Sequence, residues 1–288
     1  MTNRPEIYVS SVAFGAHNVD ELLIKAHDWG VKNVELSAGL SRDDTLVERL
    51  TTASDLRFLI HNYCPPPPKP FVLNLASEDP ETLEMSRAHA RAAVDLSQTL
   101  SARWYSVHAG FAAIVSPEHL GRQIPAENRT DKGRAAEIFE TSIRDLVAYA
   151  APRGVGILVE NNVVAVPNLV DGKNEMLLLA TAVELVDFAR QMCDENFGLL
   201  IDFGHVNVTS ASLRLDRKAF IDEVAPYTRG LHLSENDGLA DSNLPFDQSS
   251  WIGLGLAGVH PEYIVVESYR ITRSELAACI DVIEVAYE

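Results

Sequence analysis

The sequence predicts a single (β/α)8 barrel that spans residues 1–288 as one domain. Eight short runs rich in β-branched and apolar residues alternate with longer amphipathic runs, which is the pattern of parallel strands joined by helices. Polar residues gather at the C-terminal ends of strands three to eight, where such a barrel builds one site. No linker or shift in composition divides the chain.

Each predicted strand is a short apolar or β-branched run. The runs are residues 7–14, 33–37, 57–62, 104–109, 155–161, 198–203, 229–234 and 263–267. The third to the eighth carry, at or near their C-terminal ends, His61, His108, Glu160, Asp202, His232 and Glu267. In a barrel these ends converge, so we expect the six side chains to lie close together.

The predicted helices occupy the gaps, with apolar residues at helical spacing. In one of them, for example, Phe139, Ile143 and Leu146 fall on one face. An open doubly wound sheet shares the alternation but does not focus six strand ends on one site. The proline-rich stretch 65–70 follows the third strand and predicts a rigid loop at the barrel mouth. The helical runs are residues 19–29, 82–100, 132–150, 181–192, 217–224 and 274–286.

The composition provides a large apolar core and limits the partners. Hydrophobic residues make up 47% of the chain, and 41 acidic against 24 basic residues give a net charge of −17. This charge repels phosphates and anionic lipids, so it argues against a nucleic-acid binder and a membrane-surface protein. Three scattered cysteines form no disulfide framework, and residues 1–6 contain no apolar signal stretch. These features predict a cytoplasmic protein in a reducing compartment.

The strongest functional signal is a set of five side chains at or near strand ends, Glu160, Asp202, His205, His232 and Glu267, which together offer ligands that suit a metal ion. Glu160, Asp202 and Glu267 each follow an apolar triplet, and His232 lies in the seventh strand. Several carboxylates converging in a core would repel one another unless a cation lay between them. Three carboxylates and an imidazole suit Mn²⁺, Co²⁺, Fe²⁺, Mg²⁺ or a catalytic Zn²⁺. Each residue alone is explained equally well as a solvated loop residue, but their order across four consecutive strands favours a metal site.

The segments around these residues resemble a known family, the xylose-isomerase-like TIM barrels. This group holds sugar and sugar-phosphate isomerases and epimerases together with endonuclease IV. The resemblance rests on Val159-Glu160-Asn161, Ile201-Asp202-Phe203-Gly204-His205, Leu231-His232-Leu233-Ser234-Glu235-Asn236-Asp237 and Val266-Glu267. Similarity to ketose 3-epimerases implies that Glu160, Asp202, His232 and Glu267 hold one divalent metal (Mn, Co, Mg or Zn). It also implies that Glu160 and Glu267 are the catalytic acid and base, and that His205 contacts the substrate.

This chemistry predicts a metal-dependent isomerase or epimerase of a sugar or related polyhydroxy carbonyl compound. Removing a proton next to a carbonyl requires a stabilised enediolate, which a divalent ion bridging two substrate oxygens supplies. A base on one face of the sugar and an acid on the other permit inversion at carbon. The expected partner is a small sugar and neither nucleic acid nor a membrane, and the sequence leaves a homo-oligomer open.

Further side chains are expected to bind substrate. Glu35, which ends the second strand, could bind a hydroxyl or form a salt bridge at the mouth. His61 and His108 end strands on which many sugar isomerases of the group keep a substrate-binding histidine. Four other histidines, which lie away from strand ends, are expected at the surface: His27, His89, His119 and His260.

Two alternatives to the isomerase stay open. The strand ends of endonuclease IV that correspond to His61 and His108 carry zinc-binding histidines, so this resemblance implies a zinc phosphoesterase acting on abasic DNA. The acidic charge disfavours that function. So does Asp241-Ser242-Asn243, where asparagine, a poor zinc ligand, replaces the histidine of an Asp-x-His motif. The second alternative is a non-catalytic ligand-binding barrel, which the intact ligand set disfavours.

Overall fold

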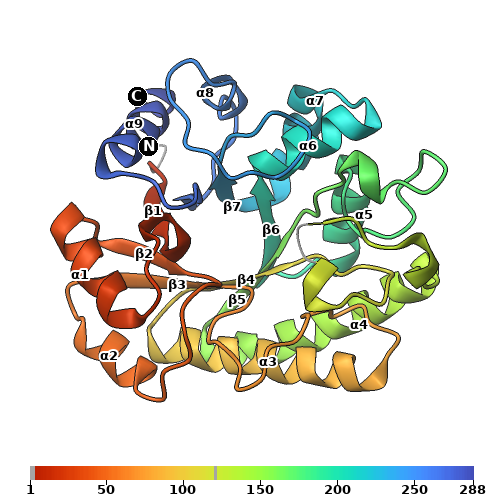
Figure 1. Cartoon of the computed structure of the whole chain (residues 1–288), viewed down its shortest axis with the longest axis horizontal. Helices are drawn as coiled ribbons and strands as arrows, with labels where there is room; N and C mark the ends of the chain where they lie inside the picture. The colour runs from red at the N-terminus through yellow and green to blue at the C-terminus, as the bar shows by residue number, and fades with distance from the viewer. Residues whose placement is uncertain (1–3, 120–121) are drawn as a thin grey trace.

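The computed structural model describes residues 4–119 and 122–288 and folds them into a closed barrel of eight parallel strands (Figure 1). The strands pair in chain order, and the eighth pairs with the first to close the barrel. The predicted single-domain (β/α)8 barrel is therefore confirmed. Its outer bounds, 1–288, stay a prediction, and residues 1–3 of the N-terminal segment lie outside the described part. Among the described residues, no helix is both long and apolar enough to cross a bilayer.

All eight strands are short and largely buried. They are β1 (Glu6–Ser10), β2 (Asn33–Leu36), β3 (Arg57–His61), β4 (Trp104–His108), β5 (Gly156–Glu160), β6 (Phe197–Asp202), β7 (Thr228–Leu233) and β8 (Tyr263–Val266). The prediction locates each of them within a few residues, except that the first strand ends at Ser10. The rest of that predicted run, Ser11–Phe14, forms a 3-10 turn. A continuous apolar run carries no periodic signal that marks where extended backbone stops.

Helices surround the barrel, and Figure 1 shows α3 and α4 side by side along one flank. The helices are α1 (Val19–Trp29), α2 (Leu46–Thr52), α3 (Pro80–Thr99), α4 (Lys132–Ala150), α5 (Ala182–Met192), α6 (Phe203–Leu213), α7 (Arg217–Val224), α8 (Ile252–Gly255) and α9 (Arg273–Ala286). Three of them, α1, α4 and α7, have the predicted bounds. Three others, α2, α6 and α8, have no counterpart in the prediction.

Helix α6 was missed because its first turns are buried on all sides. Residues 203–210 are all buried, so this part of the helix has no polar face and no amphipathic period. The helix starts directly after β6, and Asp202 is its N-cap. The Asp202 Oδ1 atom accepts a hydrogen bond from the backbone N–H of His205 at 2.7 Å. The junction of β6 and α6 therefore lies at a residue of the predicted metal site.

Strand alternation places the predicted site residues directly above a layer of apolar side chains in the barrel interior, which we call the floor of the site. Successive side chains of a strand point to opposite faces, so residues two apart share a face. One apolar layer packs against the helices, and a second, separate cluster fills the barrel interior. The interior cluster consists of Tyr8, Leu59, Ala102, Trp104, Leu158, Leu200, Tyr263 and Val265. Two residues beyond Leu158, Leu200 and Val265 come Glu160, Asp202 and Glu267, which form the polar layer above this floor.

The floor depends on a glycine in β5. A methyl group at Gly156 would overlap the buried indole ring of Trp104. We expect Gly156→Ala to lower the free energy of unfolding by about 1–3 kcal/mol, measured by urea denaturation. Gly253→Ala in α8 is the control, because a methyl there meets Val282 at an ordinary 3.6 Å. Equal stability of the two variants would contradict this packing of β4 against β5.

Candidate metal centre

The four predicted metal ligands meet at the C-terminal mouth of the barrel. Glu160 ends β5, Asp202 ends β6, His232 lies in β7 and Glu267 directly follows β8. One ligand atom of each lies within 4.8 Å of those of the other three, and all four residues are buried. They come from four consecutive strands, and Asp202 and His232 are direct neighbours in the β6–β7 register.

Several polar atoms of this group have no hydrogen-bond partner among the described residues. They include both carboxylate oxygens of Glu160 and Oδ2 of Asp202. Buried polar atoms are nearly always satisfied in folded proteins, so a group of unsatisfied ones requires an explanation. A divalent cation accounts for them, since oxygen and imidazole donors of this kind bind such ions. The residues therefore fit a metal ion for two reasons: their oxygen and nitrogen atoms are suitable ligands, and several of these buried atoms lack a hydrogen-bond partner in the part of the chain that the structure describes.

Burial and mutual contact shift the pKa values of the carboxyl and imidazole groups in this site. Burial raises the pKa of Asp202 to about 8. Burial also acts to raise the pKa of Glu160, but the nearby histidines, His108 foremost, outweigh it and hold that pKa well below its ordinary value. For His232, burial is opposed by Glu267 and other carboxylates, which raise the imidazole pKa well above its ordinary value. A bound cation would take the place of protons on Asp202 and His232.

A second group of potential ligands shares Glu160 with the first. His61, His108 and Glu160 also offer atoms within 4.8 Å of one another. The Nε2 atoms of both histidines lie 3.5 Å from Glu160 Oε2. His61 Nδ1 lies 2.9 Å from the hydroxyl of Ser106, which holds the ring with Nε2 toward Glu160. His61 is buried, whereas the His108 side chain is 36% exposed and reaches the opening of the site.

His205 stands beside the four ligands with both ring nitrogens engaged. Its Nδ1 donates to the carbonyl of Asn161 at 2.7 Å, and its Nε2 lies 3.3 Å from Asp241 Oδ2. Asn243 Nδ2 donates to the same Asp241 oxygen at 3.1 Å. The sequence singled out Asp241 and Asn243 only as an incomplete zinc motif. In the structure they instead form a hydrogen-bonded chain that ends on His205.

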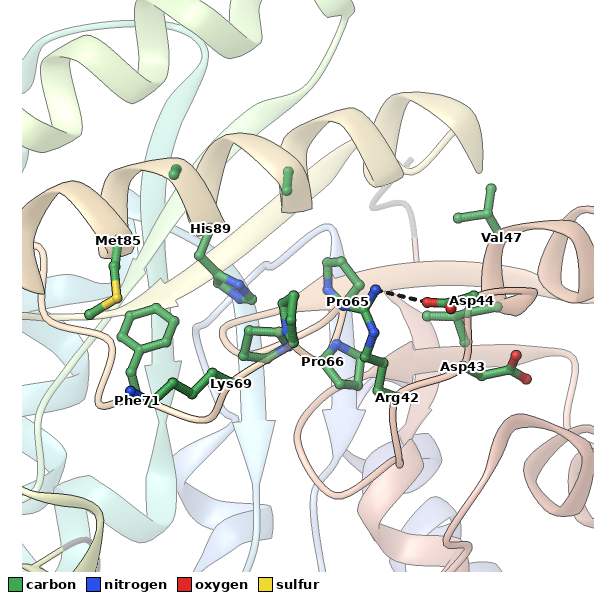
Figure 2. A pocket seen from close by; sticks show the side chains of 15 residues that line it. Arg42, Asp43, Asp44, Val47, Pro65, Pro66, Lys69, Phe71, Met85 and His89 are labelled. Atoms are coloured by element: carbon green, nitrogen blue, oxygen red, sulfur yellow. Dashed lines mark hydrogen bonds and ion pairs between the residues drawn. The ribbon is translucent and has the colours of Figure 1, made fainter.

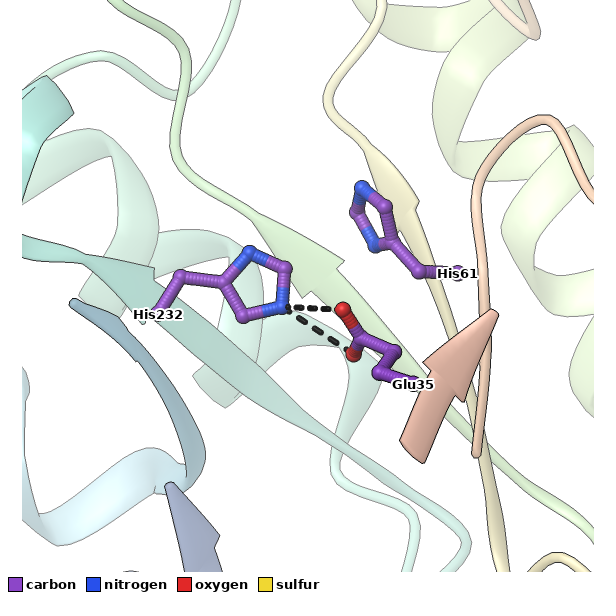
Figure 3. Close-up of side chains that lie close together, drawn as sticks. All are labelled: Glu35, His61 and His232. Carbon is purple, nitrogen blue, oxygen red and sulfur yellow. Dashed lines mark hydrogen bonds and ion pairs between the residues drawn. The ribbon is translucent and has the colours of Figure 1, made fainter. Parts of the chain in front are cut away.

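Glu35 is fully buried and contacts a predicted ligand. The His232 Nε2 atom lies 3.1 Å from Glu35 Oε2 and 3.0 Å from Oε1. Figure 3 shows the Glu35 carboxylate, which belongs to β2, reaching toward the His232 ring, with the ring of His61 close by. The expected contact of Glu35 with a substrate hydroxyl stays a prediction, and the contact present in the structure is with His232.

A separate groove lies on the flank of the barrel mouth (Figure 2). It measures about 560 Å³, and the predicted rigid loop supplies Pro65 to Pro68 as one wall. The eight predicted site residues do not line it. His89 does, and it is only 8% exposed, with its ring packed against Tyr63 and Phe71. The expectation that His89 lies at the surface is therefore wrong, because the loop after β3 folds back over α3.

Comparison with known proteins identifies the family. The model of one family, described as "Xylose isomerase-like TIM barrel", matches residues 23–262. The chain belongs to this family. No curated protein sequence matches it.

Several solved structures share the fold along nearly the whole chain. A D-tagatose 3-epimerase-like protein superposes with a TM-score of 0.74 at 15% identity, covering 98% of both chains. D-psicose 3-epimerase from Clostridium cellulolyticum H10 gives 0.67 at 16% identity, with 98% of each chain covered. A 3-keto-D-glucoside 4-epimerase from E. coli gives 0.66 at 12% identity, covering 98% of this chain and 99% of the other. At such identities the likeness establishes the fold alone.

The sequence did not single out every residue that shapes this xylose isomerase-like site. Ser106 holds His61, and it sits two residues before His108 on the inward face of β4. That spacing was the signal that could have identified it. Asn161 joins β5 to β6, because its Oδ1 accepts from the backbone N–H of Asp202 at 2.8 Å.

Metal binding in this barrel is expected to depend on pH. Below about pH 8 Asp202 carries a proton, and His232 is protonated because of the carboxylates around it. A divalent ion has to displace these protons, so we expect the affinity for Mn²⁺ to rise as the pH increases toward 8. Calorimetric titration in buffers of different ionisation enthalpy measures both the affinity and the protons released.

The variant Asp202→Asn tests whether the charge of Asp202 is needed for metal binding. It keeps an oxygen that can cap α6 but loses the charge, so we expect a folded protein without tight Mn²⁺ binding. A wild-type affinity that is independent of pH, with no proton release, would contradict this description of the site.

Proposed function

We propose that this chain is a divalent-metal-dependent isomerase or epimerase of a sugar or related polyhydroxy carbonyl compound. The observation that carries the proposal is the convergence of Glu160, Asp202, His232 and Glu267, with buried atoms that lack partners. The proposal includes one divalent ion (Mn, Co, Mg or Zn) and a small-molecule substrate in the cytoplasm. Nucleic acid and membranes are not partners in it, and a homo-oligomer is compatible with it.

In this proposal the two glutamates move the proton. A divalent ion at the site would supply a Lewis acid for substrate oxygens. Glu160 and Glu267 would remove and return the proton on the carbon next to the carbonyl. Both carboxylates border His232 Nδ1, at 3.4 Å for Glu160 and 2.7 Å for Glu267, so they face the same small volume. Their place at the top of an apolar barrel shields this volume from bulk water.

The remaining polar groups at the mouth would bind substrate hydroxyls. His108 is the most exposed of them, and His61 and His205 line the same mouth from β3 and α6. The rings form a continuous surface, with centroids 5.2 Å apart for His61 and His108 and 5.7 Å apart for His108 and His205. Imidazoles suit hydroxyl groups because each ring nitrogen can donate or accept a hydrogen bond.

The similar structures support a sugar as the substrate class. They include a D-tagatose 3-epimerase-like protein, 3-epimerases of D-psicose and L-ribulose, and a 3-keto-D-glucoside 4-epimerase. These reactions all invert a carbon whose proton is acidified by a nearby carbonyl. We therefore propose ketoses and keto-glycosides as the first compounds to test.

The acid–base assignment is tested by exchange with solvent. Metal-loaded protein is incubated in D₂O with tagatose, psicose, fructose or ribulose, and deuterium next to the carbonyl is followed by NMR. We expect Glu160→Gln and Glu267→Gln to lower exchange by about 10²–10⁴-fold, because the amide cannot accept the proton. Glu262→Gln is the control, since Glu262 precedes β8 at the opposite end of the barrel and bonds to Trp104. Normal turnover in either site variant would remove that glutamate from the assignment.

The phosphoesterase alternative keeps one specific observation in its favour. His61 and His108 share Glu160 with the four-ligand group, which is the arrangement expected of two neighbouring metal ions. The net charge of −17 and the amide of Asn243 at the third position count against it. We therefore favour one metal ion, with the histidines available to substrate.

Metal counting separates the two functions. Titration of metal-free protein with Mn²⁺ and Zn²⁺ is expected to give one tight equivalent per chain. It should be unchanged in His61→Ala, because the four-ligand group is complete without His61. Two or three tight zinc ions, with a share lost in His61→Ala, would refute the one-metal proposal. Incision of an abasic-site duplex, lost in His108→Ala, would establish the alternative, whereas we expect no salt-sensitive binding to duplex DNA.

A further inference from the structure

Glu35 makes a contact across the barrel that the proposed reaction does not use. Its side chain is 0% exposed, although it carries a carboxyl group. It lies in β2, one residue before the strand ends, whereas its partner His232 lies in β7, so the two side chains meet in the barrel interior (Figure 3). Burying a carboxylate is costly unless it is paired, so the contact with His232 is what makes this position tolerable.

The contact favours Nε2 as the nitrogen of His232 that keeps its proton when a metal ion takes Nδ1. A carboxylate within 3.1 Å of Nε2 accepts a hydrogen bond from that nitrogen. In the metal-free protein Nδ1 also faces a carboxylate, Glu267 Oε2 at 2.7 Å. A cation at the site would displace the proton from Nδ1, and the neutral imidazole would keep its remaining proton on Nε2 and offer the Nδ1 lone pair to the ion. That lone pair faces Glu160 and Glu267, the other members of the ligand group. The same contact also fixes the plane of the ring.

We infer that Glu35 is a positioning residue of the metal centre, which orients His232 and keeps its Nδ1 available as the ligand atom. Carboxylates that accept from the outer nitrogen of a ligating histidine commonly tune metal affinity in this way. The inference rests on the metal site of the proposed function and not on the identity of the sugar. Glu35 has no exposed surface with which to bind a substrate.

The neighbouring histidine has a different orienting group, which provides a matched control. His61 is held at Nδ1 by the hydroxyl of Ser106, just as His232 is held at Nε2 by Glu35. Both contacts are buried and both lie in the same polar layer. His61, however, is outside the four-ligand group. Loss of the Ser106 hydroxyl should therefore leave the affinity of that group unchanged.

The test is calorimetric titration of metal-free protein with Mn²⁺. We expect Glu35→Met, an apolar replacement of similar size, to weaken the affinity by about 10–100-fold. Glu35→Gln keeps an oxygen that can accept from Nε2, so its loss should be smaller. Ser106→Ala is expected to stay within about twofold of wild type. Circular dichroism of each metal-free variant verifies that the barrel is folded.

A second measurement needs no variant. In the zinc-loaded wild-type protein, ¹⁵N NMR of the imidazoles should show His232 protonated at Nε2 and not at Nδ1. A proton on Nδ1 would overturn the inference even if Glu35→Met failed to fold.

The outcomes distinguish the inference from the proposed function. Equal Mn²⁺ affinity in wild type and Glu35→Met would overturn the positioning role and leave the metal centre intact. A wild-type chain that binds no divalent ion would overturn both. A second Mn²⁺ equivalent that disappears in Glu35→Gln would make Glu35 a direct ligand, together with His61 and His232, and would likewise overturn the positioning role.

Discussion

The upper half of this barrel is organised by the need to neutralise negative charge buried at one point. Glu35, Glu160, Asp202 and Glu267 are all buried at the ends of strands, and no lysine or arginine forms an ion pair with them among the described residues. The side chains that contact these buried carboxylates are histidines instead of lysines or arginines. Because imidazoles can give up their protons, this arrangement can exchange bound protons for a metal ion without refolding.

Rigid backbone elements hold the charged groups in place. Asp202 is fixed because one of its oxygens caps α6, which leaves the other oxygen for the site. Asn161 bonds to the backbone of Asp202 and so ties β5 to β6. Such contacts limit the movement of side chains that would otherwise repel one another. They also explain why buried positions beside the site carry polar residues, which would be costly anywhere else in the core.

Fold and chemistry separate clearly in this family. The barrel is shared with epimerases at 12–16% identity, so the fold alone does not define the reaction. The reaction depends on which side chains stand in the polar layer and on how they are paired. Here Glu160 is common to a four-ligand group and to a pair of histidines, and Asp241 is bonded to His205 and Asn243. These pairings are the basis on which we propose one-metal proton transfer in preference to multi-metal hydrolysis.

The sequence by itself determined the barrel, its eight strands, three helices with their bounds and the four side chains proposed as ligands. These follow from local rules, since alternation and helical spacing are properties of neighbouring residues. Helix α6 was not predicted because its first turns are buried on all sides. His89 was predicted at the surface because no pattern in the sequence indicates that the loop before α3 folds over it. Only the tertiary structure decided that Glu35 meets His232 and that Asp241 meets His205. The closed barrel brings Glu35 to His232 across 197 positions, and the loop after β7 brings Asp241 to His205 across 36 positions. Neither contact is encoded in a local pattern of neighbouring residues.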